Sequence, residues 1–350
     1  KTSYNGNYGL NASWTLYNGN KRLKTIQQEK LNNQVAELDV ATSENNIQES
    51  IAQVYIQILY AAESVKVNES TLQVSIAQRD RGQELLNAGS IAKSDFAQLE
   101  AQVSTDRYQL VTAQATLEDY KLQLKQLLEL DGENEMNIYL PALSDENVLA
   151  PLPTKKDVYI SALSLRPEIE ASKLNVEASE LGIGIAKSSY LPTISLSAGI
   201  GTNHTSGSDF TFGEQVKNGW NNSIGLSVSV PIFNNRQTKS AVQKAKLQYE
   251  TSMLSLLDEQ KTLYKTIEGL WLDANSAQQR YAAANEKLKS TQISYELISE
   301  QFNLGMKNTI ELLTEKNNLL QAQQEQLQAK YMAILNTQLL KFYQGDQLAL

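Results

Sequence analysis

The chain has 350 residues, a formal net charge of −8, one histidine and no cysteine. The lack of cysteine excludes disulfides, thiol catalysis and Cys-ligated metal sites, and the single histidine, His204, has no second one with which to share a metal. The acidic excess is mild and no basic stripe is present, so nucleic acid is not expected as a partner.

Residues 7–16 form the first predicted element, a β-strand. Apolar residues at even positions alternate with small or polar ones at odd positions, which is the period of a strand with two different faces. The apolar set is Tyr8, Leu10, Ala12, Trp14 and Leu16. A half-buried sheet in a soluble protein would give the same pattern. A lipid-facing barrel wall fits better, because a chain that is otherwise helical has no other element to cover that face.

A very long helix is predicted next. From Asn20 to Ala88 the only Gly or Pro is Gly82, and an unbroken helix of about 67 residues is roughly 100 Å long. Such lengths are typical of coiled coils and helical barrels. After a turn, the chain continues with a heptad seam at Leu110, Ala113, Leu117, Tyr120, Leu124 and Leu127. Narrow apolar seams with polar flanks predict a ring of helices around water.

An irregular connector is predicted between Leu130 and Asp157, because Asp-Gly, three prolines and mixed polarity interrupt the heptads. One short helix is expected at 156–165. Pro167 then stands in the first turn of a helix that runs to about Ser189. Gly182 and Gly184 in that helix lack the third glycine of a dinucleotide-binding loop and are expected to be close-packing positions.

Two further strands follow, at 194–200 and 223–233. Both alternate apolar even positions with Ser or Gly, as in the first strand. The segment between them, 201–221, is polar and rich in Gly, Ser, Thr and Asn, which predicts an exposed hairpin loop. His204 falls in this segment and is expected to be an exposed loop residue.

The second half of the chain repeats the first at a constant offset of 216 residues. No gap is needed between Gly9 and Gly89, and the second long helix is predicted from Asn235 to Asn303. Two helices that must end at the same height cannot change length independently, so the length is under constraint, as in a tube. The identities are Gly9/Gly225, Leu10/Leu226, Ser13/Ser229, Asn18/Asn234, Lys30/Lys246, Leu31/Leu247, Leu38/Leu254, Ile51/Ile267, Leu72/Leu288, Glu84/Glu300, Asn87/Asn303 and Gly89/Gly305.

The repeat also gives an expectation for the start of the protein. In the second repeat, a helix and a strand at 167–203 precede the strand at 223–233. Their equivalents would fall before Lys1. Roughly 60 residues or more of the mature protein, with any signal or lipidation segment, are therefore expected to precede this sequence.

Three motifs resemble the TolC family of trimeric outer-membrane efflux and secretion ducts. The first leads from Leu165-Arg166-Pro167-Glu168-Ile169 to Tyr190-Leu191-Pro192-Thr193-Ile194-Ser195-Leu196. The second is the strand exit Ser229-Val230-Pro231-Ile232-Phe233-Asn234, and the third is Phe302-Asn303-Leu304-Gly305 followed by Asn308, Thr309 and Glu311. Their order and spacing on a duplicated frame carry the resemblance, which covers essentially the whole chain.

The resemblance implies a mixed fold of α-helices and transmembrane β-strands. Three protomers would contribute four strands each to one outer-membrane β-barrel, which continues into a long periplasmic α-helical barrel. Reasoning from the residues reaches part of this, because a few strands cannot close a barrel and open edges are not tolerated in lipid. The number three comes from the family. The implied segments are a barrel strand (1–18), a helical hairpin (19–130), an equatorial connector (131–166), a helical-barrel helix (167–190), a barrel hairpin (191–234), a second helical hairpin (235–345) and a C-terminal tail (346–350).

The implied function is that of an outer-membrane exit duct in a Gram-negative bacterium. It would act as a passive conduit of an efflux pump or type I secretion system, without catalytic residues, cofactor or metal. Its partners would be two further copies of the chain, a periplasmic adaptor protein, an inner-membrane pump of the RND, ABC or MFS type and outer-membrane lipid. The alternative is a soluble coiled-coil scaffold or a periplasmic adaptor hairpin protein, which has no use for the alternating strands.

Family resemblance also assigns roles at the hairpin tips. Glu311 matches an acidic ring at the periplasmic entrance, whereas the second acidic position of the family is Thr314 here. Asp95, Phe302 and Lys307 match the contacts that hold the two hairpins together, but Phe302 lacks the hydroxyl of the usual tyrosine. The sequence leaves open whether Asp95 and Lys307 form an ion pair. It also leaves open the plainer interpretation of Glu311 as an acid favoured by the helix dipole.

The turns themselves are expected to dock the adaptor. Each needs a residue in the left-handed conformation, which glycine supplies. The docking residues implied by the resemblance are Asn87, Gly89, Asn303, Leu304 and Gly305.

Overall fold

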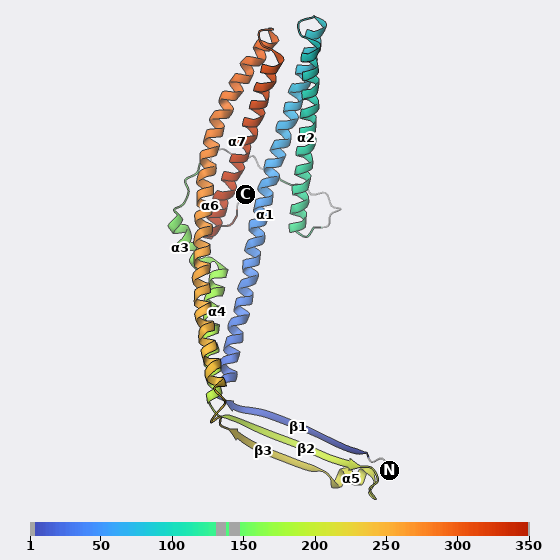
Figure 1. Cartoon of the computed structure of the whole chain (residues 1–350), viewed down its shortest axis with the longest axis vertical. Helices are drawn as coiled ribbons and strands as arrows, with labels where there is room; N and C mark the ends of the chain where they lie inside the picture. Colours follow the sequence, from blue (N-terminus) through green and yellow to red (C-terminus); the bar gives the residue numbers. More distant parts are fainter. Residues whose placement is uncertain (1–3, 131–137, 140–147, 349–350) are drawn as a thin grey trace. The chain divides into compact units, whose positions relative to one another are not determined.

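The computed structural model describes residues 4–130, 138–139 and 148–348. They form two compact units, the first made of residues 1–40 and 167–260 and the second of residues 41–166 and 261–350. The long helices α1 (Lys21–Asn87) and α6 (Gln237–Asn303) contribute to both units (Figure 1).

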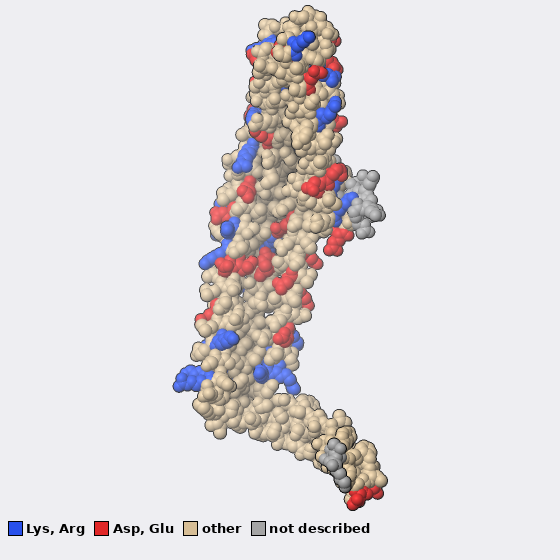
Figure 2. All heavy atoms as spheres, turned by 45° about the vertical axis from the view of Figure 1, so that its right-hand side comes forward, with Lys and Arg blue, Asp and Glu red and all other residues tan. Residues whose placement is uncertain are grey.

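The first unit contains an antiparallel sheet in the order β1-β2-β3, from Asn5–Asn18, Thr193–Thr205 and Asn221–Ser229. Its register places Trp14 opposite Leu196 and Leu196 opposite Leu226, while Ser197 lies between Ser13 and Gly225. Paired residues share a face, so the predicted separation into an apolar and a hydrophilic face is confirmed up to Trp14 on β1 and along β2 and β3. The register shifts between Thr15 and Tyr17, so that Tyr17 rather than Leu16 pairs with Ile194. The strands carry no charged residue, and the sheet region is correspondingly uncharged in Figure 2.

The prediction for the end of the third strand was too long. β3 ends at Ser229, four residues before Phe233. Ser229 pairs with Thr193, the first residue of β2. Beyond that pair β2 offers no further partner, and Pro231 has no N–H with which to extend a ladder.

The predicted loop at 201–221 was wrong in two respects. β2 continues to Thr205, and a short helix α5 (Phe212–Asn218) follows. This helix begins with a capping box in which Thr211 and Glu214 each accept from the other's backbone N–H, a signature that is legible in the sequence. His204 therefore lies in a strand, half-buried, with its ring 5.0 Å from that of Phe212.

Helix α4 (Pro167–Lys187), followed by the 3-10 turn η2 (Ser188–Tyr190), agrees with the predicted helix from Pro167 to about Ser189. It packs on α1 and α6 within the first unit. Gln28 donates to the carbonyl of Ala178 at 2.8 Å, and the hydroxyls of Ser179 and Ser252 lie 2.8 Å apart. A Cβ on Gly184 would lie 2.9 Å from Nζ of Lys24. That atom is the end of a flexible side chain, and a Cβ on Gly182 would meet only Nε2 of Gln28 at 3.5 Å, which is an ordinary contact. The predicted close packing is therefore not confirmed at Gly182 and is only weak at Gly184.

The second unit contains two helical hairpins, α1 with α2 (Lys93–Leu127) and α6 with α7 (Thr309–Gln344). Their two turns lie at the same end of the unit (Figure 1). The connector helix α3 (Lys155–Leu165) confirms the short helix expected there and packs on α7. Of the connector at 131–166, residues 131–137 and 140–147 lie outside the described part of the chain.

The apolar core of the second unit is formed by α1, α6 and α7. The narrow apolar seams expected of the helices in general do not describe α7 between residues 329 and 340. Most of the helix circumference is buried there, because α3 covers a further face. The cluster comprises Ala52, Ile56, Leu59, Val148, Ala277, Tyr281, Leu327, Ala329, Tyr331, Ala333, Ile334, Leu335 and Leu339.

The two long helices have equal length, as the sequence predicts. Each contains 67 residues, and the start and end of α6 both differ from those of α1 by 216 positions. The residues that precede them repeat as well. Asn20 and Arg236 have φ angles of 63° and 65°, and Gly19 and Asn235 have 67° and 56°. The same left-handed corner therefore starts both helices.

None of the helices in the described ranges combines the length and apolar character needed to cross a membrane. Acidic and basic side chains are interspersed along the helical surface seen in Figure 2.

Candidate functional site at the hairpin tips

Both hairpins turn with the same backbone hydrogen bonds. In the first, the N–H of Ser90 donates to the carbonyl of Leu85 at 2.8 Å, and that of Gly89 donates to Leu86 at 3.0 Å. The same two bonds recur 216 residues later, from Met306 and Gly305. This is a Schellman turn. It needs a left-handed residue, and Gly89 and Gly305 both have φ of 73°.

Glu311 closes a capping box at the start of α7. Its carboxylate accepts from the backbone N–H of Asn308 at 3.2 Å, and its own N–H donates to the Asn308 side chain at 2.9 Å. Lys307 donates to the other carboxylate oxygen. These hydrogen bonds, first from Lys307 and then from the Asn308 backbone, lower the pKa of Glu311 below 4.5. Within one chain Glu311 thus makes the contacts of a helix-start acid.

Asp95 occupies the equivalent position at the start of α2. Its carboxylate accepts from the backbone N–H of Ala92 at 3.3 Å. Ala92 has no side-chain acceptor, so only half of the capping box exists here. An Asp95–Lys307 ion pair is not among the contacts of the described residues, since Lys307 pairs with Glu311 of its own hairpin.

Phe302 and Thr314 lie in different surroundings. Phe302, in the last turn of α6, is only 3% exposed, whereas Thr314 is exposed and donates its hydroxyl to the carbonyl of Ile310 at 2.7 Å. Leu304 and Met306 in the turn are 74% and 71% exposed. The second tip thus offers an apolar surface beside its exposed end residues, Asn303 and Gly305. Asn87 at the first tip is also exposed and accepts from Gln83 at 3.0 Å.

Arg166 forms a buried junction that the sequence motif did not explain. Its guanidinium donates to Glu49 at 2.6 Å and lies 3.6 Å from the ring centroid of Tyr343. The side chain is 7% exposed. It therefore ties the end of α3 to α1 and to the last turn of α7.

Sequence reasoning also missed a buried polar cluster of Ser75, Asp106 and Lys316, which are 2%, 1% and 3% exposed. The three residues come from α1, α2 and α7, far apart in the sequence. Nothing local in the sequence signals their contact, because it depends on the register between hairpins.

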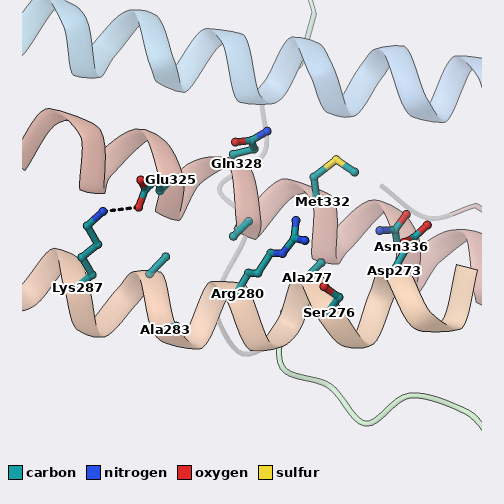
Figure 3. A pocket seen from close by; sticks show the side chains of 12 residues that line it. Asp273, Ser276, Ala277, Arg280, Ala283, Lys287, Glu325, Gln328, Met332 and Asn336 are labelled. Carbon is teal, nitrogen blue, oxygen red and sulfur yellow. Dashed lines mark hydrogen bonds and ion pairs between the residues drawn. The ribbon is translucent and has the colours of Figure 1, made fainter.

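A groove of about 580 Å³ runs between α6 and α7, away from the tips. Arg280 reaches from α6 toward α7 near Met332, and Lys287 bridges to Glu325 at one end (Figure 3). Across the described residues, no three His, Asp or Glu side chains are grouped in a way that could hold a metal ion.

The family model described as "Outer membrane efflux protein" matches residues 158–345, which is more than half of the chain. The chain belongs to this family. Among curated members, the outer membrane efflux protein BepC of Brucella suis is 24% identical over 83% of the chain and 61% of that protein. Outer membrane protein TolC of Escherichia coli is 23% identical over 86% of the chain and 62% of that protein. The chain thus spans about three-fifths of the length of these two relatives.

Solved structures agree with the efflux-protein fold. A crystal structure of CusC, described in connection with transmembrane channel formation, superposes with a TM-score of 0.83. The superposition covers 99% of this chain and 83% of that one at 18% identity. At that identity the likeness establishes the fold alone.

Proposed function

We propose that this outer membrane efflux protein is the exit duct of an efflux pump or type I secretion system in a Gram-negative outer membrane. Three copies would each contribute four strands to one shared β-barrel, which would continue into a periplasmic α-helical barrel. The duct would be passive, without catalysis, cofactor or metal. Its partners would be a periplasmic adaptor, an inner-membrane pump of the RND, ABC or MFS type and outer-membrane lipid.

The observation that carries the proposal is that one chain contains a sheet with two different faces and two helical hairpins whose long helices, α1 and α6, have equal length. Leu10, Trp14 and Leu226 on the apolar face are 73%, 64% and 66% exposed, while the other face carries serine, glycine and asparagine. An uncharged sheet with one exposed apolar face suits lipid on that side and water on the other. A soluble scaffold or an adaptor hairpin protein gives no reason for such a face. The named relatives are also outer membrane proteins.

The gate is proposed at the tips, where three copies of Glu311 would meet around the axis. Asp95, Lys307, Phe302 and Thr314 would complete it. The exposed turn residues, Asn87, Gly89, Asn303, Leu304 and Gly305, would dock the adaptor. Because each Lys307 already pairs with Glu311, the net charge of such a ring would be smaller than that of three free carboxylates.

The test is the current through the purified full-length protein in planar lipid bilayers. We expect an assembly of three copies in detergent and stepwise ion conductance that multivalent cations block. Glu311→Ala should weaken that block and reduce cation preference. A protein that stays monodisperse without detergent and carries no current would contradict the duct. Unchanged block in Glu311→Ala would contradict the gate alone.

A further inference from the structure

The buried side chains of Ser75, Asp106 and Lys316 are hydrogen-bonded to one another and to Gln102. Lys316 donates from Nζ to Oγ of Ser75 at 2.5 Å and to Oδ2 of Asp106. The Ser75 hydroxyl donates to the same carboxylate oxygen at 2.5 Å, and Gln102 donates to the other one at 2.9 Å. Burial lowers the pKa of Lys316, and its hydrogen bond with Asp106 opposes that shift.

This cluster joins one hairpin to the other. Ser75 and Asp106 belong to the α1–α2 hairpin, and Lys316 belongs to the α6–α7 hairpin. Two more cross-hairpin hydrogen bonds lie at the same level, from Gln78 to the Tyr295 hydroxyl at 2.8 Å and from Gln102 to Asn317 at 3.5 Å. We call these residues the belt: Ser75, Gln78, Gln102, Asp106, Tyr295, Lys316 and Asn317.

The segments between the belt and the turns lack such links. In residues 79–101 and 296–315, which the structure describes completely, the side-chain hydrogen bonds and ion pairs stay within one hairpin. They are Arg79–Asp80, Arg81–Glu84, Gln83–Asn87, Ala92–Asp95, Glu100–Ser104, Ala101–Thr105, Gln292–Glu296, Ser294–Glu315, Tyr295–Ser299, Lys307–Glu311, Asn308–Glu311, Ile310–Thr314 and Glu315–Asn318. From Gln78 to Gly89 the part of the hairpin beyond the belt is about 16 Å long at 1.5 Å per residue.

Belt and tips therefore differ in how easily they separate. No side-chain hydrogen bond or ion pair of residues 79–101 and 296–315 has to break when the two tips separate, because each lies within one hairpin. Separating Lys316 from Asp106 would leave a buried charge without its partner, which is strongly unfavourable. The polar contacts between the hairpins therefore oppose separation at the belt and not in residues 79–101 and 296–315.

We propose that the belt is the fixed point between the two hairpins, against which residues 79–101 and 296–315 move when the entrance opens. Ser75, Asp106 and Lys316 would then be positioning residues for the gate, acting through the helices rather than by touching the cargo. The functional part of this inference rests on the proposed duct, whereas the mechanical part concerns the chain itself.

The experiment measures amide hydrogen exchange and bilayer current on the full-length assembly. In the wild type, exchange should be fast in both tip segments and slow on the other side of the belt. Lys316→Met should carry fast exchange across the belt toward residues 60–74 and 317–330 and raise the leak current of the closed pore. Ser75→Ala is a milder variant that keeps the ion pair, and it should change both readouts in the same direction but less.

Lys287→Met is the matched control. Lys287 also pairs with an acid on a neighbouring helix, Glu325 at 2.7 Å, but this pair is exposed and lies within one hairpin (Figure 3). It should leave the exchange boundary and the leak current unchanged. Uniform exchange from the turns past the belt would overturn the proposal. So would variants at Lys316 and Ser75 that lower the melting temperature without moving boundary or current. A wild-type protein that carries no current would instead contradict the proposed duct function. The belt would still be tested in that case, because the position of the exchange boundary does not depend on the current.

Discussion

At the scale of single residues, Glu311 combines two roles. Its carboxylate caps α7 and pairs with Lys307, so its charge is already engaged before any second copy approaches. The gate proposed from the family pattern therefore starts from a local arrangement in which acid and base are joined on the same tip. The negative charge that Glu311 can present to cations therefore depends on the stability of its ion pair with Lys307.

The first prediction concerns the titration of Glu311. Its pKa in the folded protein is lowered from 4.5 by Lys307 and by the Asn308 backbone. A lowered carboxyl pKa stabilises the fold above the unfolded pKa, and this stabilisation is lost as the pH falls through the folded value. NMR titration of the carboxyl carbon should give a midpoint below 4.5, and Lys307→Met should move it upward. A midpoint that Lys307→Met leaves unchanged would show that the pair does not persist in solution.

The second prediction concerns Arg166. Replacing it by Gln leaves Glu49, whose side chain is 19% exposed, without its cation. Breaking a buried pair from one side costs about 3–5 kcal/mol, so thermal unfolding should shift strongly downward. Arg166→Lys should recover only part of the loss, because lysine lacks the planar fork that meets the carboxylate and the Tyr343 ring.

Lys289→Met is the control for Arg166. Lys289 pairs with Glu286 at 2.9 Å, but the two side chains are 62% and 74% exposed. The change should cost less than about 1 kcal/mol. Equal losses at Arg166 and Lys289 would contradict a structural junction at Arg166.

At the scale of elements, the long helices were predictable, whereas the strand ends and the short helix α5 were not. Long stretches with one glycine and no proline set the span of α1 and α6. β3 ended early because its length depends on its partner β2. Helix α5 was missed although Thr211 and Glu214 form a readable capping box. The belt could not be predicted, because Ser75 and Lys316 meet only through the register of two separate hairpins.

The third prediction uses the unequal caps of α2 and α7. Asn308 accepts from the N–H of Glu311, whereas Ala92 cannot accept from that of Asp95. Asn308→Ala should destabilise the second hairpin by about 0.5–2 kcal/mol, and Ala92→Asn should stabilise the first by a similar amount. Amide exchange in the first turn of each helix measures both effects. Changes of the same sign in the two variants would contradict the assignment of these residues as helix caps.

At the scale of the whole molecule, the equal length of α1 and α6 is the feature of the sequence that most directly supports the proposed duct. The two 67-residue helices start from the same left-handed corner and end in the same Schellman turn. The sequence could predict this equality, because identities at a constant offset record it. The number of copies and the lining of the pore are properties of the assembly and were inferred from the family.

The central claim is that the hydrophilic face of the sheet lines a conducting pore while the apolar face meets lipid. The most direct measurement is the bilayer current of variants with one cysteine introduced into these 350 residues, which contain none, during addition of a charged thiol reagent. Ser197→Cys should lose current as the reagent reacts, and Leu226→Cys, on the opposite face of the same sheet, should not. Loss of current from Leu226→Cys with none from Ser197→Cys would contradict the account, because the faces would be reversed.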